Sequence, residues 1–175
     1  MTKKAINLNE ISFIQAINIS AQWCKEWDED LLSEEVLADR IEELIKTKNG
    51  LRGFFAYTLS DKDCYLLDKL PFPLVFKLTE IGEDVVAIVV KNLIMSSAQV
   101  VAHDRKKNFE YKSASKNIAE RCKGLLRLLE TNLVTKTINE MYKNLDNLGN
   151  SFDKSEKYDV QQKEFIKKQF FDLTQ

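Results

Sequence analysis

The chain has 175 residues, 44% of them hydrophobic and 30% charged, and a formal net charge of -1. This length suits one well-buried core, and the composition is that of an ordinary soluble globular protein. The near-zero net charge argues against a protein whose main partner is nucleic acid or anionic lipid.

Charge is nevertheless uneven along the chain. From Glu26 to Glu43 there are nine acids and one base, and from Arg105 to Arg127 there are eight bases and two acids. Such runs are usually solvated helix faces. They also offer complementary surfaces that could meet across a two-fold homodimer.

The N-terminal third predicts two amphipathic helices. Asn9 can cap the first, from about Glu10 to Trp27, and Ser33 the second, to Lys48. One apolar face of the first helix carries Ile11, Ile14, Ile17, Ala21 and Cys24, and another carries Phe13, Ala16, Trp23 and Trp27. The inward stripe of the second helix is Leu37, Ile41, Leu44 and Ile45, and Asn49 and Gly50 are expected to end it.

Residues 51–84 have the weakest pattern. The first ten fit a short helix or a strand, and Pro71 and Pro73 then mark a loop. Residues 74–90 fit either a helix broken at Gly82 or a small hairpin, and we favour the helix because its pattern continues toward His103.

The longest apolar run extends from Asp84 to Asp104 and predicts a central helix surrounded by other elements. Its interruptions by polar residues such as Lys91 argue against a membrane span. Four polar residues share one face of the expected helix. These are Asn92, Ser96, Gln99 and His103.

The C-terminal part predicts further helices. A charged connection leads into an amphipathic helix from about Ser115 to Leu133, followed by a turn at residues 132–135. The next helix carries Ile138, Met141, Leu145 and Leu148 and ends before Gly149. After a polar linker, Val160 to Leu173 can form an amphipathic helix through Phe165, Ile166, Phe170 and Phe171.

The expected fold class is therefore all-α, a single compact multi-helix domain around the central helix at 84–104. The alternative is α+β, with a small hairpin from 74–90. Residues 1–150 would form the helical domain, and residues 151–175 a linker and a C-terminal helix docked on it.

Several chemistries are excluded by the residues that are present. Five glycines form neither a GxGxxG nor a GxxxxGK[ST] loop, and a single histidine rules out HExxH and three-His zinc sites. Three distant cysteines without CxxC fit buried thiols of an intracellular protein. The N-terminus lacks the apolar stretch of a signal peptide. We predict no cofactor, no metal site, no catalytic residue and a cytoplasmic location.

The leading functional hypothesis is a non-catalytic helical interaction or regulatory protein, binding a protein partner or a second copy. Aromatic residues and a basic stripe that shares one helix face supply the candidate surfaces. These are Phe13, Trp23, Trp27, Lys112, Lys116, Lys123 and Arg127.

Two alternatives belong to other classes. A small molecule or cofactor could bind a pocket lined by Asn92, Ser96, Gln99 and His103, since such pockets are mostly apolar with a few convergent polar groups. Weak nucleic-acid binding through the 112–127 stripe is the third, although no aromatic residues interleave there to stack on bases. Insertion into a membrane is not expected.

Overall fold

The computed structural model describes residues 7–145 and 157–174, and all regular elements within these ranges are helices. The predicted all-α class is confirmed. The alternative hairpin at 74–90 is wrong, because these residues belong to two helices joined at Gly82. The chain divides into two compact units, Met1–Ile81 and Gly82–Gln175.

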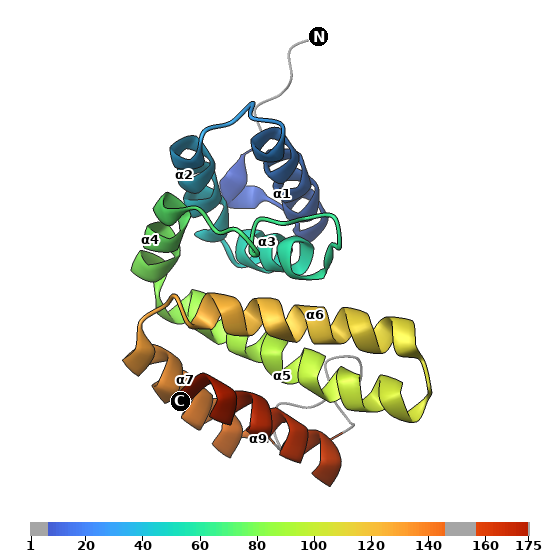
Figure 1. Ribbon diagram of the computed structural model, residues 1–175. Helices are drawn as coiled ribbons and strands as arrows, with labels where there is room; N and C mark the ends of the chain where they lie inside the picture. The colour runs from blue at the N-terminus through green and yellow to red at the C-terminus, as the bar shows by residue number, and fades with distance from the viewer. Residues whose placement is uncertain (1–6, 146–156, 175) are drawn as a thin grey trace. The chain divides into compact units, whose positions relative to one another are not determined.

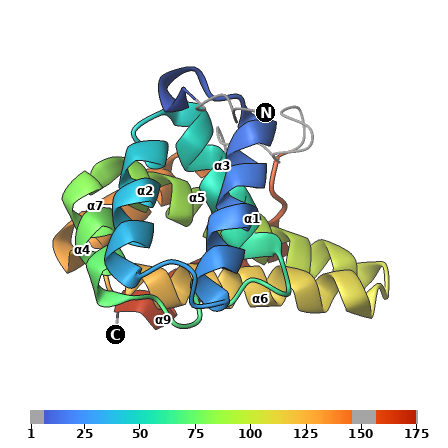
Figure 2. The ribbon, with the colours of Figure 1, turned by 90° about the horizontal axis from the view of Figure 1, so that it is seen from above.

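Helix packing in the first unit is centred on α2 and α3. Within the described residues its elements are η1 (Leu8–Glu10), α1 (Phe13–Asp28), α2 (Glu34–Ile45), α3 (Lys48–Ser60) and α4 (Phe72–Ile81). α3 packs against α1 and α2, and α4 packs against α2. Figure 2 shows α1 and α2 side by side, seen from above.

The second unit is built on the predicted central helix. Its described helices are α5 (Glu83–Arg105), α6 (Phe109–Leu126), α7 (Thr131–Lys143) and α9 (Val160–Thr174). α5 and α6 form a long antiparallel hairpin, and α7 and α9 pack against α5 (Figure 1). The predicted span of 84–104 is thus confirmed within one residue at each end.

α5 is long and apolar enough to cross a membrane, but 56% of its most apolar window is buried inside the structure. Val89, Leu93 and Ala98 are among its buried residues. This is the environment of a core helix in a soluble protein. The cytoplasmic location stays a prediction.

Several helix boundaries differ from the predictions because other residues provide the caps. α1 begins at Phe13 rather than near Glu10, since Ser12 forms a capping box with Gln15. Ser33 caps α2 as predicted. α2 ends at Ile45.

The chain then begins a new helix where we expected a stop. The Thr47 hydroxyl accepts a hydrogen bond from the Gly50 N–H at 3.0 Å, so Asn49 and Gly50 lie inside α3. An unexpected cap also changes the start of α6. This helix begins at Phe109 and not near Ser115, because the Asn108 side chain caps it.

The turn expected at 132–135 is also misplaced. α6 ends at Leu126, and α7 begins at Thr131. Leu145 is buried as predicted, whereas Leu148, Gly149 and the linker as far as residue 156 lie outside the described residues. Ile14 and Phe171, which we assigned to apolar faces, are exposed.

The predicted division into residues 1–150 and 151–175 stays a prediction. The contacts within the structure divide the chain at another place, between Ile81 and Gly82. α9 packs against α5 within the second unit through both polar and apolar side chains. Ile166 and Phe170 are buried, and the Gln162 side-chain amide donates to the Ala98 carbonyl of α5 at 3.3 Å.

The N-terminus of α9 is held by Asp159. This carboxylate accepts from the Gln162 N–H at 3.1 Å, and Gln162 accepts from the Asp159 N–H at 3.0 Å. Asp159 also forms a bidentate ion pair with Arg105 at the end of α5. The two terminal guanidinium nitrogens of Arg105 lie 2.6 and 2.9 Å from the two carboxylate oxygens. Hydrogen bonding to Arg105 lowers the pKa of Asp159 to about 2.

We expect Asp159→Ala to lower the free energy of unfolding by about 1–2 kcal/mol, because it removes the cap and the ion pair together. Asp159→Asn keeps a capping oxygen and loses less. Because the pKa is lowered, the ionised carboxylate stabilises the fold fully at pH values above 3.8, the ordinary pKa of aspartate. This contribution is lost as the pH falls toward 2. Urea unfolding at neutral pH and at about pH 3 tests this, and equal losses in both variants would contradict a capping role.

Gly53 allows a close approach between α1 and α3. A Cβ atom at this position would lie 2.5 Å from the Ala16 Cβ atom and 3.0 Å from both the Ile17 nitrogen and the Phe13 carbonyl oxygen. Gly124 in α6 is the opposite case, since its Cβ position has no neighbouring atom within 4 Å.

Gly53→Ala is expected to lower the free energy of unfolding by about 1–3 kcal/mol, because the methyl group overpacks this contact. Gly124→Ala is the matched control and is expected to raise it by about 0.5–1 kcal/mol through helix propensity. Urea unfolding of both variants measures the difference. A stabilised Gly53→Ala variant would show that α1 and α3 separate without cost.

Candidate functional site

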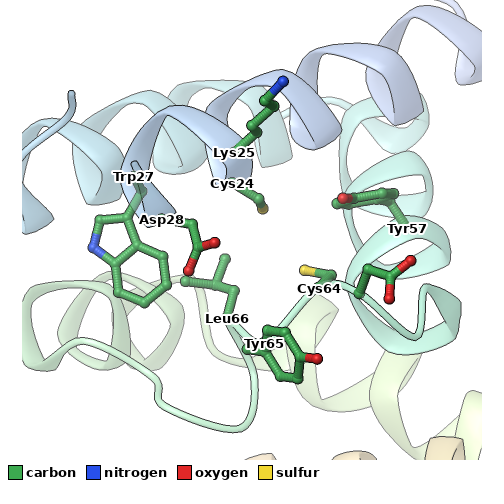
Figure 3. A pocket seen from close by; sticks show the side chains of 9 residues that line it. Cys24, Lys25, Trp27, Asp28, Tyr57, Cys64, Tyr65 and Leu66 are labelled. Carbon is green, nitrogen blue, oxygen red and sulfur yellow. The ribbon is translucent and has the colours of Figure 1, made fainter. Parts of the chain in front are cut away.

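A pocket of about 200 Å³ opens in the first unit beside the C-terminal end of α1 (Figure 3). Three aromatic rings surround its space. Trp27 extends from α1, Tyr57 from α3, and Tyr65 from the segment that joins α3 to α4. Leu66 supplies a buried apolar wall.

The charged groups of the pocket are mainly acidic. Asp28, the last residue of α1, and Asp63 both line it. The Asp63 N–H donates to the Asp61 carboxylate at 2.8 Å, so a third acid lies close by. Lys25 also lines the pocket, but its side chain points away from the rings in Figure 3 and pairs with Glu29 at 3.7 Å.

Two buried thiols form one side of the pocket. Cys24 and Cys64 face each other, and the hydrogen bond to Cys64, followed by burial, raises the pKa of Cys24. Burial and the neighbouring Cys64 and Asp61 raise the pKa of Tyr57 as well. Cys24 and Tyr57 therefore stay protonated at neutral pH. The thiolate, which is the nucleophilic form of cysteine, is disfavoured here.

The predicted burial of all three cysteines is confirmed. Cys122 belongs to α6, where burial raises its pKa too. In the ranges 7–145 and 157–174, no group of three or more His, Cys, Asp or Glu side chains is arranged to hold a metal ion. The absence of a cofactor stays a prediction.

The polar stripe of α5 uses its hydrogen bonds within its own helix. The Asn92 amide donates to the Ile88 carbonyl at 2.9 Å, and the buried Ser96 hydroxyl donates to the Asn92 carbonyl at 2.7 Å. Such bonds satisfy polar side chains inside a helix without a ligand. Gln99 is partly exposed.

His103 lies near the end of α5, partly exposed, with its ring centre 5.5 Å from that of Tyr111 in α6. The stripe's role as a ligand pocket therefore stays a prediction, without support from the hydrogen bonds of Asn92 and Ser96.

The aromatic residues of α1 do not form one open surface. Trp23 is only 8% exposed, with the Arg40 guanidinium 5.8 Å from its ring, which corrects its predicted surface position. Phe13 is partly exposed beneath Arg52, at 5.2 Å. Trp27 lines the pocket described above. No other predicted site residue lines that pocket.

The basic stripe is also divided. Lys116 and Arg127 are exposed, and Lys112 pairs with Asp104 at 2.5 Å. Lys123 is only 6% exposed and pairs with Glu120 at 2.8 Å, which corrects its predicted surface position.

The acidic run at 26–43 is partly neutralised within the first unit. Glu26 pairs with Arg40 at 3.2 Å, and Lys77 of α4 reaches Asp39 at 3.3 Å and Glu42 at 2.6 Å. Partner binding by this run or by the basic stripe stays a prediction.

We expect the free energy of unfolding to fall as pH rises above the ordinary thiol value of about 9, because the raised pKa keeps Cys24 protonated in the fold while the unfolded chain ionises. Cys24→Ala removes this titration, so its stability should depend less on pH in that range. Urea unfolding from neutral pH to about pH 10 measures both slopes. Parallel slopes would contradict the environment described for Cys24.

Comparison with known proteins places the chain in a family. No curated protein and no solved structure matches it. Residues 12–173 match the family described as Uncharacterised conserved protein UCP020893, a range that extends through both units. Because this match covers nearly the whole chain, the protein belongs to that family.

Proposed function

We propose that the protein is a non-catalytic binding protein whose first unit recognises an organic ammonium group. The observation that supports this is the combination of Trp27, Tyr57 and Tyr65 with the carboxylates of Asp28 and Asp63 around one pocket. Aromatic faces attract cations through their electron-rich surface, and this is the usual way in which proteins bind alkylated ammonium groups.

The pocket's size fits a head group better than a whole ligand. Its volume of about 200 Å³ is below the 300–1,000 Å³ typical of sites that enclose a drug-sized molecule. The acids supply long-range attraction for a cation, and the rings replace part of its hydration shell. The ammonium group can belong to a free amine or to a side chain of a partner protein.

The raised pKa of Cys24 favours binding over catalysis. A cysteine nucleophile needs a lowered pKa or an adjacent base, whereas the pKa of Cys24 is raised. The acids near the pocket disfavour the thiolate further, since like charges repel. The protonated Cys24 thiol instead provides a polarisable, uncharged group on this side of the pocket.

We expect choline to bind saturably. The changes in NMR chemical shift that it causes in the protein should map to the pocket residues. Trp27→Leu should weaken binding about tenfold, the size of a partly desolvated cation–π contact, and Asp28→Asn should weaken it severalfold. Glu35→Gln removes the same charge from an exposed position of α2 and should leave the affinity unchanged.

Two further probes separate the effect of charge from that of shape, and show whether the ammonium group belongs to a free amine or to a partner protein. 3,3-Dimethylbutanol has the shape of choline without the charge and should bind far more weakly; equal affinity would overturn the proposal. Tighter binding of a trimethyllysine peptide than of choline would identify a partner's side chain as the ligand. The reverse order would identify a free amine.

A further inference from the structure

The turn between α5 and α6 is a tightly closed end of the hairpin. The Asn108 N–H donates to the His103 carbonyl at 2.9 Å, and the Lys107 N–H donates to the Asp104 carbonyl at 3.0 Å. This pair of bonds is the Schellman arrangement, which requires a left-handed residue. Lys107 takes that conformation, with φ of 54°.

Two large aromatic side chains near this turn are exposed. Phe109, the first residue of α6, is 69% exposed, and Tyr111 is 59% exposed. Figure 1 shows the turn at the free end of the α5–α6 hairpin. Aromatic residues, phenylalanine and tyrosine included, are enriched where proteins bind partners.

The same end is positively charged. Residues 103–116 include five bases and two acids. Arg105 is held by Asp159 and Lys112 by Asp104, while Lys106, Lys107 and Lys116 are exposed. On an ideal helix at about 100° per residue, Phe109 also shares one face with Lys112 and Lys116. The exposed ring thus stands at the head of the basic stripe.

We propose that this hairpin end docks on the surface of an anionic lipid bilayer, with Phe109 in the interfacial layer and Lys106, Lys107 and Lys116 facing the lipid phosphates. Apolar and aromatic side chains anchor a protein at this depth, and each lysine near an anionic surface adds attraction. The contact is peripheral and leaves α5 in the core of its unit.

The shape of this end favours a flat surface over a nucleic acid. A single strand binds along a groove in which successive bases stack, whereas the aromatic residues here lie at a closed turn. Lysine at position 107 is informative as well. Glycine is the preferred residue for a left-handed C-terminal cap, so the lysine side chain is present in spite of backbone strain.

Sedimentation with vesicles of phosphatidylcholine, with and without phosphatidylglycerol, tests the proposal on the full chain. We expect binding only to the anionic vesicles, weakened by added salt. Lys106→Glu with Lys107→Glu should weaken it by about tenfold or more. Lys167→Glu with Lys168→Glu makes the same charge change at exposed positions of α9 and should have much less effect.

Phe109→Ser and Lys107→Gly complete the design. Phe109→Ser should weaken vesicle binding severalfold with no change in its salt dependence. Lys107→Gly should raise the Tm by relieving the left-handed lysine, and should still weaken vesicle binding. Equal binding by the two double variants would overturn the proposal. So would binding to neutral vesicles, or a single-stranded RNA that binds more tightly than the vesicles and competes with them.

Discussion

The apolar circumference of α5 is the constraint on which the second unit depends. Each Å² of apolar surface left in water would cost about 25 cal/mol, so a helix of this kind must be covered on several sides. α6, α7 and α9 all pack against it. The cover ends near Arg105, where Asp159 fixes the start of α9. The hairpin end beyond that point is therefore free to carry charged and aromatic side chains.

The helices were more predictable than their ends. Apolar periodicity identified α2 and α5 because burial of one stripe, or of a whole circumference, is written directly into the sequence. Caps are harder, because Asn9 and Ser12 are both chemically able to start α1. Contacts distant in sequence decide between such candidates. The Asn49 amide, for example, donates to the Ile11 carbonyl at 3.1 Å and helps to set where both segments begin.

The candidate site could not be predicted in the same way. Trp27 and Tyr57 come from segments thirty residues apart, and neither has a motif that points to the other. Helical spacing correctly grouped Asn92 and Ser96 on one face, but spacing cannot reveal that each bonds to its own helix. It also could not distinguish Lys116, which is exposed, from Lys123, which is buried. Exposure depends on neighbouring elements that periodicity does not contain.

The contact at Gly53 has a consequence for the shape of the pocket. Gly53 precedes Tyr57 by one helical turn, and the residues it touches belong to the same helix as Trp27. The missing side chain thus sets the distance between the two helices that carry these rings. A methyl group there would act as a wedge, tilting one pocket wall away from the other. The dimensions of the ligand that we propose for this pocket would then depend on a residue that does not line it.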